Sequence, residues 1–259
     1  MRDFDIRTPH IARIYDYWLG GKDHFEADRA AAEAAMAATP TIKPGVTANR
    51  RFLGRAVRFM AENGVRQFLD VGTGIPTANN THEAAQAIDP DARVTYVDND
   101  PIVLAHARAL LTGKPGTTAY IDADARDTSR ILTEAARTLD FSQPVGVMLI
   151  AVLHCVPDDD KPGGIVADLM AACPPGSYLA ITHPARDQLD IAVKGEEALT
   201  KSMGQKVTFR TKAAVSGFFA GHTELIDPGV VPVQEWHPIE DADLTSPPTA
   251  MWGGVGRKG

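Results

Sequence analysis

The chain of 259 residues has only two cysteines, Cys155 and Cys173, and both lie in apolar surroundings. Two cysteines do not provide the several disulfides that stabilise small secreted domains, and their apolar neighbours predict buried, reduced thiols in a cytoplasmic protein. An excess of positive charge is also absent. The net charge is −7 and the arginine and lysine residues are scattered, so no basic surface predicts a nucleic-acid partner.

Long hydrophobic runs are absent too. The longest, from Val145 to Leu153, is much shorter than the roughly 20 apolar residues that a helix needs to cross a bilayer, so no membrane partner is predicted. The N-terminus shows no signal-peptide core. The remaining composition, with 44% hydrophobic and 23% charged residues, is that of an ordinary globular protein with one large domain or one domain and an appendage.

Residues 1–64 show the patterns of helices. Thr8-Pro9 combines an N-cap residue with a proline that suits the first helical position. Apolar residues then recur at the spacing of a buried helical stripe, at Ile11, Ile14, Tyr15, Trp18 and Leu19. Further helices are expected over 25–38 and 47–63. We expect this part of the chain to form a helical cap or lid.

From Val65 onward the pattern changes to alternating strands and helices. Strands are expected at 67–71, 93–97, 117–121, 145–152 and 177–182. Helices are expected at 80–88, 101–111, 129–138 and 164–173. Apolar, β-branched strands that alternate with helices are typical of a parallel sheet covered on both faces. Residues 65–259 are therefore predicted to form a doubly wound α/β core with a mostly parallel sheet.

Two later segments depart from this alternation. Residues 184–207 have a helical composition and are expected to form an insertion near the functional site. After a helix near 213–220, the segments 224–235 and 250–256 are expected to form two more strands. Such a hairpin places an antiparallel strand in the sheet and gives seven strands in all.

The most informative segment reads Phe68-Leu-Asp-Val-Gly-Thr-Gly-Ile-Pro-Thr77. A strand ends, and the chain turns through Gly72 and Gly74, which let the backbone approach a ligand that a Cβ atom would exclude. The next strand ends at Asp98, whose carboxylate is placed to accept hydrogen bonds from ribose hydroxyls. The pattern predicts a nucleoside pocket at the carboxyl edge of a parallel sheet.

This loop departs from the dinucleotide-binding fingerprint. Thr77 stands where the fingerprint has a third glycine, and Pro76 removes an N–H that would help to bind a pyrophosphate. A nucleoside without phosphates fits better, and S-adenosylmethionine is the commonest cofactor of that kind. The structural alternatives are a tight strand-to-helix turn at the glycines and a helix cap at Asp98, although Asp100 is better placed to cap.

Asp70-x-Gly72-x-Gly74, the acid Asp98 and the turn Asp122-Ala-Asp124-Ala-Arg126-Asp127 together resemble the class I S-adenosylmethionine-dependent methyltransferases. The run Ala12-Arg-Ile-Tyr-Asp-Tyr-Trp-Leu-Gly-Gly-Lys-Asp-His24 narrows the resemblance to an actinobacterial S-adenosyl methyltransferase family, formerly a domain of unknown function. The resemblance covers nearly the whole chain. It implies a Rossmann-like core of seven strands, S-adenosylmethionine as cofactor and methyl transfer to a small or medium-sized acceptor.

The resemblance also implies the residues that bind the cofactor. The candidates are Tyr17, Gly21, Asp23, Asp70, Gly72, Gly74, Asp98, Asn99, Asp124, Ala125 and Ala151. Asp70 and the two glycines are expected to contact the methionine end, Asp98 the ribose, and Asp124 with Ala125 the adenine. Residues 151–154 are expected to lie under the sulfonium. They lack the Asn/Asp-Pro-Pro-aromatic motif of enzymes that methylate base amino groups, which argues against such a substrate.

The segment from Tyr17 to Asp23 is predicted to close over the cofactor. Tyr17 lies off the buried stripe, and the glycines that follow it allow a close approach of the backbone. A closed segment would exclude water and orient the methyl group. Simple packing is the better interpretation for Tyr15 and Trp18.

Histidine and carboxylate side chains supply the remaining candidates. His154 and His183 both follow predicted strands, where each is either a structural core residue or a proton acceptor, and His154 is the candidate general base. The acids of the 122–127 turn lack the spacing of a calcium loop, so no metal is predicted. The acidic run at 158–160 is interpreted as a solvated loop.

Two other classes of function stay open. A non-catalytic module that senses S-adenosylmethionine would lack an acceptor cavity beside the methyl group. A nicotinamide-dependent oxidoreductase is disfavoured by Thr77 and Pro76. The sequence predicts neither the acceptor nor the oligomeric state.

Overall fold

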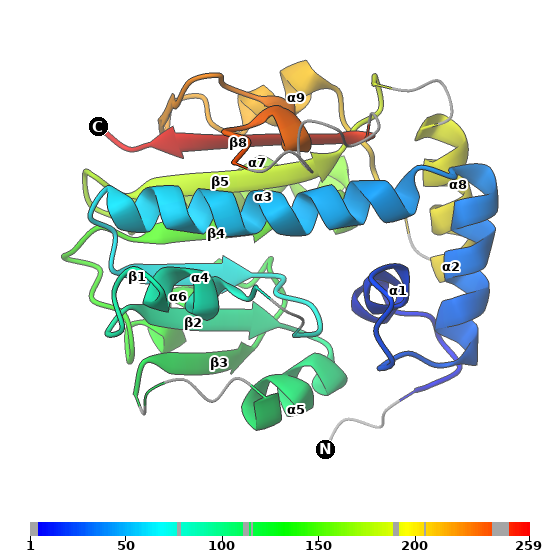
Figure 1. Cartoon of the computed structure of the whole chain (residues 1–259), viewed down its shortest axis with the longest axis horizontal. Helices are drawn as coiled ribbons and strands as arrows, with labels where there is room; N and C mark the ends of the chain where they lie inside the picture. The colour runs from blue at the N-terminus through cyan, green and yellow to red at the C-terminus, as the bar shows by residue number, and fades with distance from the viewer. Residues whose placement is uncertain are drawn as a thin grey trace.

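A mostly parallel β-sheet organises the chain in a computed structural model (Figure 1). The structure describes residues 5–76, 79–110, 114, 116–188, 192–204, 206–239 and 249–259. Its strands are β1 (Gln67–Val71), β2 (Arg93–Asp98), β3 (Thr118–Asp122), β4 (Gly146–Ile150), β5 (Tyr178–Pro184), β6 (Glu224–Leu225), β7 (Val231–Pro232) and β8 (Met251–Arg257). The order is β3-β2-β1-β4-β5-β8-β6, with β7 also paired to β8.

The first five strands lie parallel to one another, close to their expected ranges, so the doubly wound α/β prediction is confirmed. β8 runs antiparallel to β5, as expected. The strand expected over 224–235 is instead two short strands, which gives eight strands within the described residues. A turn divides it, because Pro228 has no N–H to donate and Gly229 has a φ of +82°.

Nine helices accompany the sheet in the described part of the chain. They are α1 (Ile11–Trp18), α2 (Glu26–Ala38), α3 (Ile42–Glu62), α4 (Thr81–Gln86), α5 (Pro101–Leu110), α6 (Thr128–Ala135), α7 (Pro162–Ala171), α8 (Ala192–Met203) and α9 (Lys212–Gly217). α1 begins after His10 rather than at Thr8-Pro9, because His10 is extended and donates its N–H to Asp28 at 2.9 Å. α3 begins earlier than expected, with Pro44 in its first turn, where a missing N–H costs little.

Side chains of the central strands alternate between two cores, as the pleat requires. Leu69 and Val147 join one core with residues of α6, α7 and α9. Phe68 and Met148 join the other, which contains the apolar side of α3. Figure 1 shows α3 running across this face. Because helices cover both faces, β1 and β4 are buried along their whole length.

A third core lies beyond the carboxyl ends of the parallel strands. It joins Ile14 of α1 and Ala32 of α2 to Leu199 of α8, which belongs to the expected insertion. In Figure 1 these helices stand at the side toward which the arrowheads of β1 to β5 point. α1, α2 and α8 are called the helical layer below. They cover the edge of the sheet at which open α/β proteins bind their ligands.

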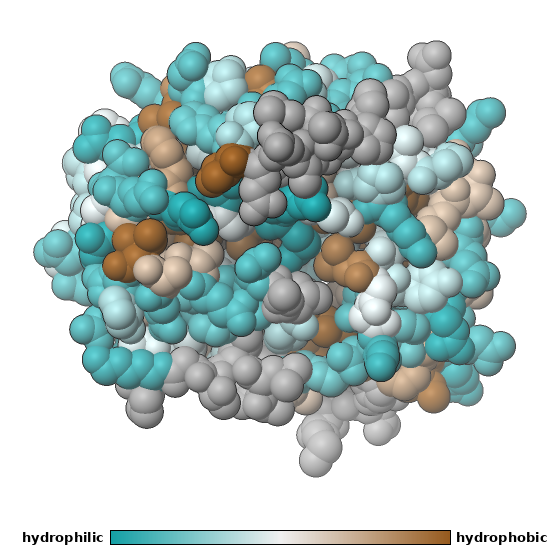
Figure 2. Space-filling model, viewed as in Figure 1, coloured by the Kyte–Doolittle hydropathy of each residue, from teal (hydrophilic) through white to brown (hydrophobic). Residues whose placement is uncertain are grey.

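The molecular surface is mainly polar on the face shown in Figure 2, where hydrophobic residues form small, separate groups. The exposed large apolar side chains of the described residues are Ile6, Ile88, Val193, Leu225 and Ile239. Within the same residues, no helix is both long and apolar enough to cross a membrane.

A substitution of Gly146, at the start of β4, tests the packing of α3 on the sheet. A Cβ atom at this position would lie 2.6 Å from Phe68 Cδ1 and 3.0 Å from Met60 Sδ. Gly146→Ala should lower the free energy of unfolding by about 1–3 kcal/mol through overpacking. The control is Gly54→Ala in α3, where a Cβ meets no atom within 4 Å and should stabilise by about 0.5–1 kcal/mol. Urea denaturation measures both, and equal effects would contradict the packing described.

Candidate functional site

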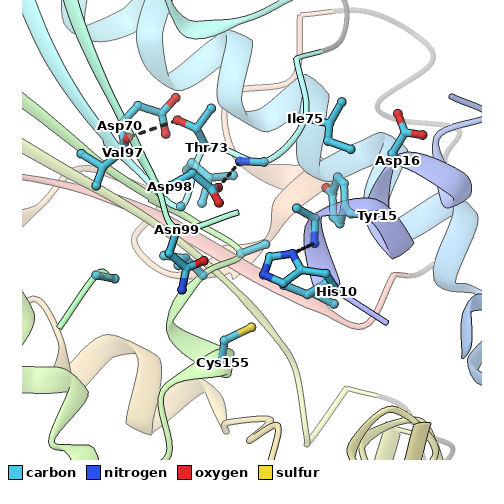
Figure 3. Close-up of a pocket in the computed structure, with 18 of the residues that line it drawn as sticks. His10, Tyr15, Asp16, Asp70, Thr73, Ile75, Val97, Asp98, Asn99 and Cys155 are labelled. Atoms are coloured by element: carbon cyan, nitrogen blue, oxygen red, sulfur yellow. Dashed lines mark hydrogen bonds between the residues drawn. The ribbon is translucent and has the colours of Figure 1, made fainter. Parts of the chain in front are cut away.

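The carboxyl ends of the central strands open into a cavity of about 180 Å³, called the first cavity. Its strand-end residues include Asp70, Gly72, Gly74, Asp98, Asn99, Asp124, Ala125, Ala151 and Cys155. On its other side lie residues of α1 and of the positions just before and after it, including His10, Tyr15, Asp16 and Leu19. Figure 3 shows these two groups facing one another. Eight of the eleven predicted cofactor residues therefore line one cavity.

The loop after β1 is fixed to β2 by its backbone. The N–H groups of Gly72 and Thr73 donate to Val97 O at 2.8 and 3.2 Å, and the two loop glycines have φ values of +76° and +68°. A Cβ atom at Gly72 would overlap the Val152 side chain, so this glycine is needed for packing. At Gly74 a Cβ would meet no described atom within 4 Å, and this glycine therefore faces the open space of the first cavity.

The carboxylate of Asp98 joins that loop to the turn after β2. Its Oδ2 accepts from Gly74 N–H at 2.9 Å (Figure 3). Its Oδ1 accepts from Asp100 N–H, also at 2.9 Å. Burial raises the pKa of Asp98, and these two hydrogen bonds oppose the rise. Asp100 caps α5 by accepting from Ile102 N–H at 2.8 Å, as the sequence predicts.

Asp70 lies deeper in the first cavity and is 4% exposed. Thr81 Oγ1 donates to its carboxylate at 2.6 Å. Burial raises the pKa of Asp70 to about 6, although the Thr81 hydrogen bond and the charge of Arg50 favour the ionised form. A carboxyl group with such a pKa changes its protonation state between mildly acidic and neutral pH.

Asp124, expected at the adenine, lines the first cavity beside Ala125. Arg126 holds its carboxylate at 2.7 Å and also contacts Asp160 at 2.8 Å. The Arg126 hydrogen bond lowers the pKa of Asp124. Asp127 caps α6 by accepting from Arg130 N–H at 3.2 Å. These acids are thus paired or capping, and the described residues contain no group of three metal-ligating side chains.

Tyr17, Gly21 and Asp23 do not line the first cavity. The Tyr17 hydroxyl donates to Glu33 at 3.0 Å. A Cβ at Gly21 would overlap the carboxylate of Asp16, which accepts from Asp23 N–H at 2.9 Å. This segment therefore positions Asp16, which does line the first cavity, and a direct role of the three residues in binding stays a prediction.

Sequence reasoning missed Tyr15 and Asp16 on α1. Tyr15 has the spacing of the buried stripe, but its hydroxyl accepts from Asn49 Nδ2 at 2.8 Å and its side chain lines the first cavity. Asp16 is 3% exposed, and an acid beside the buried stripe of a helix is the signal that could have identified it.

His154 does not line the first cavity but a neighbouring one. Burial, together with the charge of Arg210, lowers the pKa of His154 to about 4. His183 uses both ring nitrogens, since Nδ1 lies 2.9 Å from Pro184 O and Nε2 lies 2.8 Å from Arg210 Nη1. His183 is therefore a structural residue.

Cys155 lines the first cavity, but burial raises the pKa of its thiol to about 12, so it is a poor nucleophile.

The whole sequence, residues 1–259, matches the model of a family described as S-adenosyl methyltransferase. The chain belongs to this family. The resemblance inferred from the N-terminal motif is thereby confirmed, and this family member is an S-adenosylmethionine-dependent methyltransferase. Among curated proteins, none matches the sequence.

Solved structures agree with this assignment. A DUF574 family protein from Streptomyces avermitilis is 42% identical with a TM-score of 0.91, over 98% of this chain and 99% of its own. A candidate methyltransferase from Thermobifida fusca is also 42% identical with a TM-score of 0.90, over 98% and 96%. The plantazolicin methyltransferase BpumL, solved with S-adenosylhomocysteine, is 12% identical with a TM-score of 0.53, over 96% and 95%, and shares the fold alone.

The raised pKa of Asp70 predicts that the free energy of unfolding depends on pH. Its pKa of about 6 in the native state exceeds the ordinary value of 3.8, so the native state keeps a proton that the unfolded state loses between these values. The contribution of Asp70 to stability is therefore complete at the acidic end and lost as pH rises through 6, by about 3 kcal/mol in all. Because part of this loss has already occurred at pH 4, Asp70→Asn should gain about 2–2.5 kcal/mol of unfolding free energy relative to the parent between about pH 4 and pH 7.

Urea denaturation at both pH values measures the difference between the two proteins. The amide that replaces the carboxyl group keeps an oxygen for the Thr81 hydroxyl, so the comparison isolates the charge. A difference that does not change with pH would contradict the raised pKa.

Proposed function

We propose that the first cavity binds S-adenosylmethionine across the carboxyl ends of the strands. The adenine lies against Asp124 and Ala125 after β3, and the ribose lies at Asp98 and Asn99 after β2. The methionine portion follows the loop after β1, and the sulfonium lies near Ala151. The observation that carries this proposal is the pairing of Asp98 with Gly74 N–H, at a glycine whose missing Cβ leaves open space.

The residues of the first cavity fit such a nucleoside. Asp98 offers a carboxylate at a strand end, where it can accept from two vicinal hydroxyls. Gly74 adds no side chain to the space beside it. The acidic side chains of Asp16 and Asp70 also line the cavity, and they complement a cofactor with a sulfonium and an ammonium group.

Bound S-adenosylmethionine supplies a methyl group on a positively charged sulfur, which is already a good electrophile. The chain has mainly to align an acceptor with this methyl group and to exclude water. Tyr15 of α1 and Leu19, which directly follows this helix, cover the cavity. The Tyr15 hydroxyl accepts from Asn49 and donates to Val46 O at 3.2 Å. The helical layer thereby supplies a rigid cover rather than an open edge.

Two observations bear on the alternative functions, a non-catalytic sensor and a nicotinamide-dependent oxidoreductase. A non-catalytic sensor has no need of an acceptor cavity, but a second cavity adjoins the first, which favours catalysis. Membership of the family decides against a nicotinamide-dependent oxidoreductase.

The acceptor class and the cell compartment are also proposals. A small molecule fits better than a nucleic acid, since the net charge is −7 and acids surround the first cavity. The free thiols of Cys155 and Cys173 support a cytoplasmic location. An actinobacterial source, expected from the N-terminal motif, stays a prediction.

Asp98→Asn should weaken S-adenosylmethionine binding by about 10- to 100-fold, because hydrogen bonds to a charged group contribute roughly 1.5–3 kcal/mol. The matched control is Asp122→Asn. Asp122 pairs in register with Asp98 at the end of the next strand but does not line the first cavity. Titration calorimetry measures both, and equal affinities of the two variants would overturn the ribose assignment.

Gly74→Ala should weaken cofactor binding at least tenfold, because its methyl group would enter the open space of the first cavity. Gly116→Ala serves as the control, since Gly116 also has a positive φ of +84° and no atom within 4 Å, but lies outside the cavity. Both variants carry the same kind of backbone strain. The same loss of affinity in both would mean that the loop after β1 is only a structural turn.

A further inference from the structure

A second cavity of about 70 Å³ adjoins the first. Ile11, Tyr15 and Ala151 line both, so the two spaces meet beside the end of β4. Most of the second cavity is apolar, with Trp18, Ile42, Val46, Leu199, Phe209 and Met251 in its lining. The helical layer and the start of α3 therefore build a space that the central strands alone do not have.

Two polar atoms in this lining have no hydrogen-bond partner among the described residues. They are Nδ1 of His154, a residue that is 5% exposed, and Oγ1 of Thr41. A buried polar group without a partner costs roughly 1–3 kcal/mol. Since both residues line the second cavity, a ligand bound there could supply a partner to either group after a small rotation of its side chain.

Charge limits what the second cavity can hold. No aspartate, glutamate, lysine or arginine is found in its described lining. The low pKa of His154, about 4, keeps the imidazole neutral near pH 7, with one ring nitrogen able to accept a proton. An ionised ligand would lose its hydration there without gaining a counter-charge.

Size limits it further. An engineered apolar cavity of about 150 Å³ binds benzene. The second cavity has about half that volume and opens toward the first, so a single ring fits only if its reacting edge lies at the shared border. Trp18, Phe209 and Met251 offer the aromatic and sulfur contacts that planar rings prefer.

We propose that the second cavity is the acceptor site, and that it takes a small, uncharged molecule of at most one ring with a hydroxyl group facing His154. This inference rests on the proposed binding of S-adenosylmethionine in the first cavity. In the reaction the acceptor oxygen forms a bond to the methyl carbon while the carbon–sulfur bond breaks and its electron pair stays on sulfur. As the oxygen–carbon bond forms, the hydroxyl proton becomes strongly acidic, so a ring nitrogen of His154 takes it although this imidazole is a weak base. The imidazolium then gives the proton up when the products leave and water enters the cavity. The products are a methyl ether, S-adenosylhomocysteine and a proton.

The test uses phenol as a probe with the full-length protein saturated with S-adenosylhomocysteine. Phenol should bind saturably. Benzoate should bind at least tenfold more weakly because it is charged, and 2-naphthol at least tenfold more weakly because it is too large. Val46→Phe fills the second cavity and should weaken phenol binding at least tenfold. Val193→Phe, on the exposed side of α8, is the matched control and should leave it unchanged.

His154→Leu is the second variant, in case Val46→Phe does not fold. It should weaken phenol binding at least tenfold and abolish the formation of anisole from phenol and S-adenosylmethionine, measured by mass spectrometry. Neither His154 nor Val46 lines the first cavity, so both variants should bind S-adenosylhomocysteine like the parent.

Phenol binding that is absent in the parent, or unchanged in His154→Leu, would overturn the acceptor site. Equal binding of benzoate or 2-naphthol would overturn the stated class of acceptor. Failure of the parent to bind S-adenosylhomocysteine would instead contradict the proposed function, and this separate measurement distinguishes the two failures.

Discussion

The ligand-binding edge of the molecule depends on the buried carboxylate of Asp98. At 8% exposure this group has lost most of its hydration, and the N–H groups of Gly74 and Asp100 replace it. The same two bonds hold the glycine loop against the end of β2. Asp100 in turn lies 2.9 Å from His10 and 3.3 Å from Arg13, so α1 is fixed above the first cavity. A continuous series of hydrogen bonds and ion pairs therefore connects the end of β2 to α1.

The helical layer distinguishes this protein from the α/β core alone. α1 and α2 come from the N-terminal segment and α8 from the insertion, yet they share one core. That core lies over the strand ends, beside both cavities. The core of the sheet supplies the groups that suit a nucleoside, whereas the helical layer and the start of α3 supply half of the residues that line the second cavity. With the acceptor in the second cavity, as proposed, its selection would depend in part on segments that lie outside the βαβ pattern.

Local sequence patterns predicted much of this arrangement. Apolar runs and the glycine loop identified the parallel strands, and Asp100 caps α5 as expected. The side of α1 that faces the first cavity could not be predicted, because the stripe pattern shows that Tyr15 is buried and Tyr17 is not, but not which groups of other helices lie beside each. Asn49 of α3 donates to the Tyr15 hydroxyl, whereas Glu33 of α2 accepts from the Tyr17 hydroxyl. The division between β6 and β7 was also missed, since apolar periodicity does not show where pairing with β8 is interrupted.

A crystal structure with S-adenosylhomocysteine tests the central claim most directly. The account predicts the nucleoside in the first cavity, with both ribose hydroxyls within hydrogen-bonding distance of Asp98 and the adenine beside Ala125. The sulfur should lie near Ala151, at the border with the second cavity. A nucleoside bound elsewhere, or one whose ribose does not contact Asp98, would contradict the account.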